Sequence, residues 1–376
     1  MTRIKIDTLT SVHVGSGETL QYGTDFVCVN SENGDFVSVV EPRKILELIG
    51  DEHVSNWLAA IERKESVKKI ISLYAPKAKP EEYSKRLVVD WTDGVKTTDT
   101  LKEHIHDGMG KPYIPGSSIK GAIRTAVLAT LAKKQTGLDS KIVDYKGKVN
   151  ANMVESELFG KDPNSDIFRF LQVGDAIFGD NYEVAIRMVN INERPQNGFW
   201  DKSKQQLIEA ICSEDSAEFQ MKLKPEFYSF AKSNWPDSPK ISPIGKMPAE
   251  MESLAFLFQL INQHTENLIE SEIEYWQGKE EDDESDHVTT YIEKMSEVLK
   301  QVKSCKQGQE CVLRLGHGSG WRFITGAWAE NLENFYSVVV PVSRPKNFNY
   351  QNFAFPKSRR VDDQCELLGF VKLTIL

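Results

Sequence analysis

Hydrophobic and polar positions alternate near both ends of the chain, which predicts strands there. RIKIDTL at residues 3–9 alternates with a period of two, and LLGFVKLTIL at residues 367–376 is a second strand-like run. The runs DFVCV and DFVSVV are separated by SENG, a sequence typical of a hairpin turn. Further strands are expected at residues 86–91, 168–178 and 182–192.

The clearest predicted helix begins at Ser117. Its apolar positions follow a helical period and form one stripe: Ile119, Ala122, Ile123, Ala126, Val127 and Leu131. Ser117 or Ser118 is expected to cap it, and Gly137 to end it. Gly121 lies inside and costs about 1 kcal/mol against alanine, which indicates that something approaches the backbone closely.

The remaining segments set the fold class. Residues 43–74 are expected to be helical, as is a region that ends at Lys303, while residues 194–245 read as loops with some helix. MESLAFLFQLI fits a strand or a helix, and CVLRLGHGSGWRFITGAWAE reads as strand, glycine loop and helix. Strands and helices mix without a regular βαβ repeat, which favours an α+β fold. Each half has a glycine-rich turn after a strand, so the pattern indicates two related domains.

Composition narrows the functional classes. A hydrophobic fraction of 40% over 376 residues is typical of a globular protein. No apolar run approaches the length of a membrane span, and the N-terminal residues lack a hydrophobic signal region, so a cytoplasmic location without membrane contact is expected. The five cysteines form no CxxC pair and no zinc spacing, so reduced thiols and no metal or other cofactor are expected.

The net charge of −9 is local in origin. Ten acidic residues and one lysine lie between residues 266 and 286, and the rest of the chain holds 45 basic and 45 acidic residues. We interpret the last part of this run, EEDDESD at residues 280–286, as a solvated, mobile segment. The overall charge therefore does not exclude RNA binding, which depends on local clusters.

Four segments are candidates for contact with phosphates or bases. The helix from Ser117 places Lys120 and Arg124 on one face beside a helix N-terminus, which binds anions; the alternative is a capped helix with a solvated basic edge. HVGSGE at residues 13–18 and GHGSGW at residues 316–321 are glycine loops that either cradle a phosphate or form plain turns. Residues 344–360 hold five basic residues with aromatic residues between them. The segment either binds single-stranded nucleic acid or is a surface loop whose aromatic side chains pack on the core.

Signals for an enzyme are weak. His104 and His106 in EHIHDG lie two apart, but the metal motif HxHxDH is absent, so a structural role is favoured. His13 can act as a base on an RNA 2′-hydroxyl, although a structural role is again favoured.

EHIHDGMGKPYIPGSSIKGAIRTAV is similar to a hallmark segment of the RAMP superfamily of CRISPR proteins. TSVHVGSGE resembles the N-terminal strand and turn of that family, and GHGSGW its C-terminal glycine loop. The ending, PKSRR to LLGFVKL, resembles one branch, the fifth Csm subunit of type III-A effector complexes. The resemblance implies two RRM-like (ferredoxin-like) domains. We place the first at residues 1–165, with a helical insertion, and the second at residues 166–376, with an acidic helical insertion.

The resemblance also implies a function. A protein of this branch is a non-catalytic subunit that binds the 3′ part of the CRISPR RNA (crRNA), caps the filament of backbone paralogues and supports crRNA maturation. Its partners are crRNA, target RNA, other Csm subunits and host nucleases. The residues expected to contact RNA are Gly15, Ser16, Gly17, Ser117, Ser118, Lys120, Arg124, Gly316, His317, Gly318, Ser319, Gly320, Arg322, Lys357, Arg359 and Arg360.

A RAMP endoribonuclease that uses His13 or Asp25 is the alternative function. The backbone paralogue cleaves RNA with an aspartate in an N-terminal loop, usually followed by Asn-Pro. Here Asp25 is followed by Phe26 and Val27, which argues against cleavage. A generic RRM-like RNA binder outside CRISPR is a third reading.

Overall fold

A five-stranded antiparallel sheet forms the centre of the fold. The computed structural model describes residues 1–31, 34–63, 65–144, 146–179, 181–193, 198–236, 247–324, 327–343, 356 and 358–376. The strand order is β13 (Glu310–Arg314), β15 (Phe370–Ile375), β1 (Thr2–Thr8), β12 (Ser216–Leu223) and β8 (Leu171–Val173). β1 pairs with β15 on one side and with β12 on the other, so the strands predicted at the two ends of the chain are confirmed and lie side by side.

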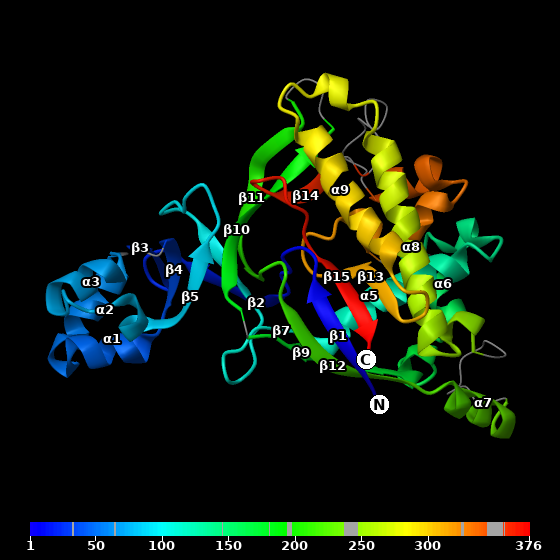
Figure 1. Ribbon diagram of the computed structural model, residues 1–376, viewed down its shortest axis with the longest axis horizontal. Helices are drawn as coiled ribbons and strands as arrows, with labels where there is room; N and C mark the ends of the chain where they lie inside the picture. The colour runs from blue at the N-terminus through cyan, green and yellow to red at the C-terminus, as the bar shows by residue number, and fades with distance from the viewer. Residues whose placement is uncertain are drawn as a thin grey trace.

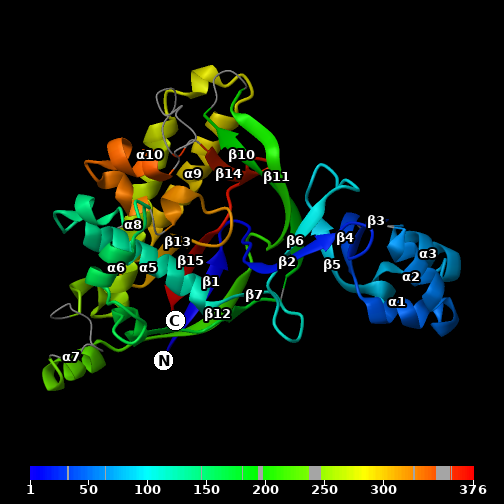
Figure 2. The same cartoon turned by 180° about the vertical axis from the view of Figure 1, so that it is seen from behind.

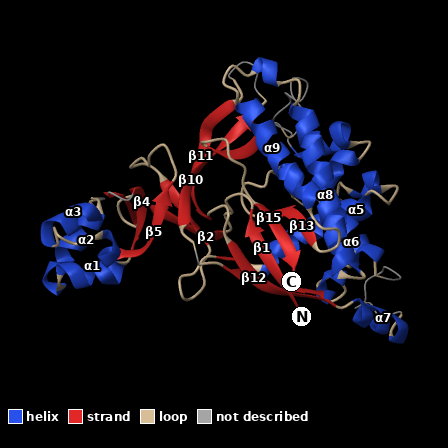
Figure 3. Cartoon of the chain, in the orientation of Figure 1, coloured by secondary structure: helices blue, strands red, loops and turns tan. Residues whose placement is uncertain are grey.

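Helices cover one face of this sheet, as Figures 1 and 3 show. The helices are α5 (Gly116–Ala132) and α8 (Leu254–Trp276), and α9 (His287–Ser304) packs against α8. Ile4 and Ile6 of β1 share one buried apolar cluster with Ile119 and Ile123 of α5 and Ile261 of α8. The order β1, α5, β8, β12, α8, β15 is the βαββαβ arrangement of an RRM-like unit.

A second, curved sheet extends from this unit (Figure 2). Its strands in spatial order are β2 (Gly15–Gln21), β6 (Thr100–His104), β11 (Trp200–Ile211), β10 (Glu183–Asn192), β5 (Ser84–Asp90), β4 (Gly34–Val40) and β3 (Phe26–Ser31). β14 (Ser358–Asp362) also pairs with β10. The predicted hairpin is present as β3 and β4. The pairs β5–β10 and β6–β11 are parallel and the others are antiparallel, so this sheet does not repeat the order of the first.

A small helical lobe lies beyond the β3–β4 hairpin at one end of the molecule (Figure 1). It contains α1 (Pro42–Ile49), α2 (Val54–Glu62), α3 (Val67–Tyr74) and α4 (Pro80–Tyr83), packed around Ile45, Ile70 and Ile71. The other short elements are β7 (Tyr113–Ile114), β9 (Ala176–Ile177), α6 (Asn152–Leu158), α7 (Pro225–Asn234) and α10 (Val340–Ser343). Single helical turns complete the description: η1 (Asp51–His53), η2 (Leu138–Lys141), η3 (Ile167–Phe170), η4 (Ala249–Met251), η5 (Glu280–Asp282), η6 (Trp321–Phe323), η7 (Ala327–Asn331) and η8 (Phe335–Val339). None of the described helices is long and apolar enough to cross a membrane.

The α+β class is confirmed, while the prediction of two RRM-like domains is not. The structure shows one RRM-like unit, and its sheet takes strands from both sides of residue 165. The domain boundary stays a prediction. The expectation of mainly loops over residues 194–245 is wrong, because β11 and β12 lie there. β12 alternates buried and exposed positions, with Ala217, Phe219 and Met221 inside, but the first half of β11 is polar and exposed enough to read as a loop.

Helix α5 begins differently from its prediction. Pro115 takes the N-cap position and no side chain caps the helix there, so the expected caps by Ser117 or Ser118 are wrong. Instead, the amide of Gly116 donates a hydrogen bond to Oδ1 of Asp175 at 2.7 Å. A Cβ atom on Gly116 would lie 2.3 Å from the carbonyl oxygen of Val173, so the close passage of the chain after β8 requires glycine here.

The other predicted features of α5 also change. The helix ends at Ala132, before Gly137. Gly121 has no atom of the described residues within 4 Å of a Cβ built on it, so the expected close approach is not made by the described part of the chain. Gly116 is the crowded glycine of this helix.

The two glycines of α5 provide a matched test of this packing. Gly116→Ala should lower the free energy of unfolding by about 2 kcal/mol or more, because the added methyl group overlaps a fixed carbonyl. Gly121→Ala should raise it by about 0.5–1 kcal/mol, because glycine in a helix interior is destabilising. Urea denaturation of both variants measures the difference. Equal effects of the two substitutions would contradict the close packing at Gly116.

Candidate nucleic-acid interface

The two glycine segments predicted from the sequence meet in the structure. The second is a loop, but residues 15–18 form the first part of strand β2, at an irregularity in its pairing with β6, so the prediction of a loop there is wrong. The first segment follows β1 and the second follows β13, and the amide of His317 donates a hydrogen bond to the carbonyl of His13 at 2.8 Å. Gly316 has a φ of 80°, and a Cβ there would lie 2.5 Å from the same carbonyl oxygen. The contact between the segments therefore requires glycine at this position.

A pocket of about 260 Å³ lies among the start of β2, strand β6, His13 before β2 and His317 in the loop after β13. It is lined by His13, Gly15, Gly17, Glu18, Thr19, Lys102, Glu103 and His317. The sequence predicted four of these as site candidates: His13, Gly15, Gly17 and His317. Lys102 and Glu103 were missed, because only the pairing of β2 with β6 brings them to the loop.

His13 is buried at the inner wall of the pocket, with 3% of its surface exposed. Its Nδ1 lies 2.5 Å from the backbone oxygen of Glu209. A carbonyl oxygen only accepts hydrogen bonds, so Nδ1 carries the proton and Nε2 carries a lone pair. Burial, with smaller effects of His317 and Lys102, lowers the pKa of His13 to about 4, against the opposing effect of this hydrogen bond. The ring is therefore neutral near pH 7.

Charged groups of both signs lie at the outer part of the pocket. Burial lowers the pKa of His317, and the charges of Lys102 and Arg360 lower it further. Nε2 of His317 lies 2.9 Å from Oε1 of Gln206, on β11. Lys102 and Arg360 thus place positive charge near His317, while Glu18 and Glu103 also line the pocket, and Glu103 is paired with Arg86. Arg360 was a predicted RNA contact, and the structure places its charge near His317.

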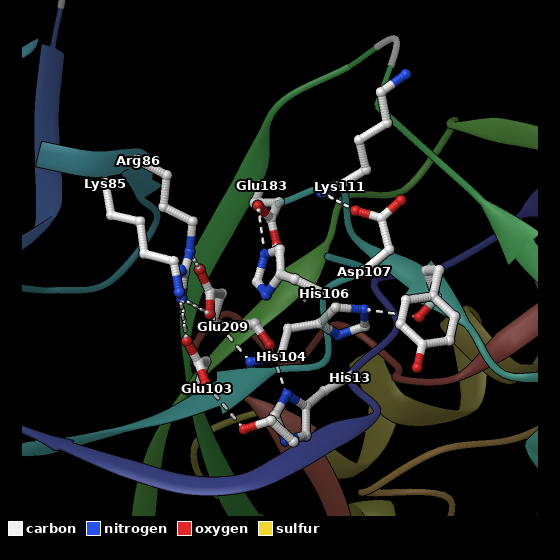
Figure 4. A network of polar contacts seen from close by, with 12 residues as sticks. His13, Lys85, Arg86, Glu103, His104, His106, Asp107, Lys111, Glu183 and Glu209 are labelled. Carbon is white, nitrogen blue, oxygen red and sulfur yellow. Dashed lines mark hydrogen bonds and ion pairs between the residues drawn. The ribbon is translucent and has the colours of Figure 1, made fainter. Parts of the chain in front are cut away.

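An ion-pair network supports the pocket from behind (Figure 4). Glu209 is completely buried, and Arg86 donates to its two oxygens from Nε at 2.5 Å and Nη2 at 2.8 Å. Nη2 of Arg86 also reaches Glu103 at 3.0 Å, and Glu103 accepts a hydrogen bond from Ser16 at 3.0 Å. The network therefore ties the first glycine segment to strands β5, β6 and β11. Breaking one member of such a buried pair is strongly destabilising.

His104 has the structural role that its sequence context favoured. Its Nδ1 accepts the amide hydrogen of Val14 at 3.2 Å, and Nε2 lies 3.2 Å from the carbonyl oxygen of Tyr113. Burial lowers its pKa well below the usual value, which keeps it neutral. His104 thus holds the chain on either side of the pocket.

His106 lies beside two carboxylates. Its Nε2 is 2.9 Å from Glu183, and ligand atoms of His106, Glu183 and Glu209 lie within 4.8 Å of one another (Figure 4). Both oxygens of Glu209 already accept hydrogen bonds from Arg86, which a metal ion would have to displace. The contacts therefore describe an ion-pair network.

The two basic residues of α5 have different surroundings. Arg124 forms ion pairs with Glu155 at 2.9 Å and Asp166 at 2.7 Å, and its guanidinium lies 4.3 Å from the ring centre of Phe159. Lys120 is half-buried, forms no ion pair within the described chain, and has a pKa lowered mainly by burial. Lys120 is free to meet a phosphate, whereas Arg124 joins α5 to α6 and to the segment after it.

Two other arginines predicted to contact RNA are buried. Arg322 and Arg359 both pair with Glu272, at 2.6 Å from Nη1 of Arg322 and 3.0 Å from Nη2 of Arg359. Their guanidinium groups lie 4.8 and 5.0 Å from the ring centre of Tyr275. This arrangement gives both a structural role and leaves their RNA contact without support from the fold. Lys357 lies outside the described residues, as do most residues of the loop 344–360.

The acidic run at residues 266–286 also differs from its expectation. Its first half belongs to α8, where Glu272 has no exposed surface. Within EEDDESD, Asp283 is buried and accepts hydrogen bonds from the amides of Ser285 and Val288, so the interpretation as a solvated segment is wrong at Asp283. Burial by itself would raise the pKa of Glu272, but Arg359 and Arg322 outweigh that effect and lower the pKa to about 2.

The remaining candidates lie in turns. Asp25 accepts a hydrogen bond from the amide of Gln21 at 2.8 Å and fixes the turn between β2 and β3, outside the residues that line the pocket. Ser319 is buried and donates a hydrogen bond to the carbonyl of Gly316. Gly318 and Gly320 both have positive φ values, 94° and 79°, which glycine adopts readily.

Comparison with known proteins places this arrangement in a family. The family model of the RAMP superfamily matches residues 5–323. The chain belongs to the RAMP superfamily. This RAMP chain is similar in structure to a chain of a Csm–crRNA–target RNA ternary complex of a type III-A CRISPR-Cas system, with a TM-score of 0.64 and 21% identity, over 99% of this chain and 100% of that one. It is also similar to T. onnurineus Csm5, with a TM-score of 0.64 and 19% identity, over 99% and 100% of the two chains. None of the curated proteins matches the sequence.

The buried pair at Glu272 predicts a dependence of stability on pH. Its folded pKa is about 2, below the ordinary value of 4.5, so its contribution is fully present above pH 4.5 and is lost as pH falls toward 2. Glu272→Gln should cost about 3–5 kcal/mol at pH 7, because two buried arginines lose their charge partner. It should also flatten the pH dependence between about pH 4.5 and 2. Chemical denaturation across this range measures both effects.

Glu274→Gln is the matched control, because Glu274 is exposed on the same helix. It should leave stability within about 0.5 kcal/mol of the unaltered protein. A Glu272 variant with an unchanged acid dependence would show that its carboxylate is not the group held by the arginines.

Proposed function

We propose that this RAMP protein is a non-catalytic RNA-binding subunit of a type III-A CRISPR (Csm) ribonucleoprotein effector. The observation that carries the proposal is the meeting of two glycine segments at one pocket, which Lys102 also lines. Alternating glycines expose backbone amides, and Lys102 and Arg360 add positive charge, which together suit a nucleic-acid backbone. Similarity along the whole chain to a component of a Csm–crRNA–target RNA complex supports the same function.

The finer role rests on the sequence resemblance to the fifth Csm subunit. In this role the chain binds the 3′ part of the crRNA, caps the filament of backbone paralogues and supports crRNA maturation together with host nucleases. Base pairing between guide and target reads the sequence, so the protein needs only to bind the sugar–phosphate backbone of the RNA and recognise its shape. Its partners are then crRNA, target RNA and other Csm subunits, in the cytoplasm.

The contacts divide the predicted RNA-binding residues into two groups. The glycine segments, Ser117, Lys120 and Arg360 are available to a polynucleotide. Arg124, Arg322 and Arg359 are paired with carboxylates inside the protein and support the elements that carry the first group. RNA binding should therefore depend directly on Lys120 and only indirectly on Arg124.

An endoribonuclease that uses His13 is the second candidate, because Nε2 of His13 carries an unshared lone pair in the pocket. A pKa of about 4 makes this nitrogen a weak base near neutral pH, which argues for binding over cleavage. Asp25 is held in its turn and does not line the pocket. Cleavage of labelled RNA by the pure chain, lost in His13→Ala, would favour the nuclease.

Lys120 and Arg124 provide a test of the division. Lys120→Ala should lower RNA retention in the assembled complex and reduce the slope of log affinity against log salt by about 0.7, the value for one phosphate contact on a single strand. Its melting temperature should stay unchanged. Arg124→Ala should instead lower the melting temperature by several degrees, because two carboxylates lose their partner.

The measurement is purification of the tagged chain from its native cell, with sequencing and quantification of the bound RNA at several salt concentrations. Repeat-derived guides together with related subunits are the expected result. Mixed cellular RNA, or none, would contradict the assignment to a CRISPR effector. Unchanged retention in Lys120→Ala at every salt concentration would remove this residue from the interface.

A further inference from the structure

Nε2 of His13 is a hydrogen-bond acceptor that the protein leaves unused. Within the described part of the chain, the hydrogen bond of the His13 ring uses Nδ1, and Nε2 faces the pocket. A Cβ atom on Gly15 would lie 3.3 Å from this nitrogen, so the absence of a side chain at Gly15 leaves it open. A bound molecule in the pocket therefore meets a lone pair.

The ring is held so that this acceptor cannot exchange with the donor. The carbonyl oxygen of Glu209 accepts a hydrogen bond from Nδ1–H of His13. The side chain of Glu209 is itself held by Arg86. The rings of His104 and His317 flank His13 edge to face, with centroid separations of 6.0 and 5.8 Å. The tautomer with a free Nε2 is thus built into the fold.

The chemistry of this acceptor selects among the parts of a nucleotide. A phosphodiester offers only acceptor oxygens, so it does not bind a nitrogen lone pair. A hydroxyl group and a base N–H group both donate and can bind it, but the ribose hydroxyl is the donor that lies next to a phosphate. Lys102 lines the same pocket and supplies a cation for a phosphate next to that hydroxyl. A hydroxyl donor next to a phosphate is what a ribonucleotide presents and a deoxyribonucleotide lacks.

We propose that His13 selects RNA over DNA by accepting a hydrogen bond at Nε2 from a ribose 2′-hydroxyl, while Lys102 holds an adjoining phosphate. This inference rests on the proposed function, since it specifies which polynucleotide the same pocket takes. The low pKa of His13 keeps Nε2 unprotonated at neutral pH and makes it a poor base, so recognition proceeds without cleavage.

The experiment compares two oligonucleotides on the purified full-length chain. Fluorescence anisotropy at pH 7.5 measures the affinity for a labelled single-stranded oligouridylate and for the same oligomer of 2′-deoxyuridine. The unaltered protein should prefer the ribose form about three- to tenfold, the effect of one hydrogen bond. Lys102→Gln should weaken the binding of both oligomers and leave the ratio of the two affinities unchanged.

Two substitutions of His13 separate its hydrogen bonds. His13→Asn keeps a donor in the position of Nδ1 and removes the acceptor, so the preference for ribose should disappear. His13→Gln keeps an acceptor in the position of Nε2, so part of the preference should remain. His53→Asn is the control, because His53 stacks on Tyr74 in the helical lobe and should not change the ratio. Melting curves confirm that each variant is folded.

The outcomes distinguish this inference from the proposed function. Equal affinity of the unaltered protein for the two oligomers, or a preference that survives in His13→Asn, overturns the inference and leaves the proposed function intact. Cleavage of the ribose oligomer that depends on His13 overturns it in favour of the nuclease. Absence of RNA binding by the unaltered protein overturns both.

Discussion

One backbone hydrogen bond, from the amide of His317 to the carbonyl of His13, joins the two glycine segments of this RAMP protein. The segments follow β1 and β13, strands that are 300 residues apart in sequence but separated only by β15 in the sheet. The same carbonyl excludes any side chain at Gly316. The pocket, the orientation of His13 and the position of His317 all depend on this contact, because neither segment forms the site alone.

Arginine–carboxylate pairs hold the elements around this site. Glu209, Glu272 and the pair Glu155–Asp166 each bind at least one arginine from a distant part of the chain. Bidentate pairing of planar guanidinium groups fixes orientation as well as distance. Several arginines are thus used inside the protein, whereas Lys102 and Gly17 line the pocket.

The pattern of apolar positions predicted the elements that have a clear period. It missed strands whose side chains are polar because they face solvent in the folded protein. β1, the β3–β4 hairpin and α5 follow from period alone, whereas the polar first half of β11 reads as a loop because its side chains face solvent. The glycine segments followed from their motifs. Lys102 carried no local signal, since the register of β2 with β6 brings it to the pocket. Sequence also cannot separate a free basic residue such as Lys120 from one paired inside, such as Arg359, because the carboxylate partner lies far along the chain.

The position of β15 affects how this protein can form during translation. β15 lies between β1 and β13, and its residues, Phe370–Ile375, are synthesised after all the other strands. The first strand therefore lacks this neighbour until residues 370–375 have left the ribosome, and contacts of such sequence separation form slowly. During that interval the apolar face of β1 has only part of its sheet, which makes the nascent chain a natural client for a chaperone.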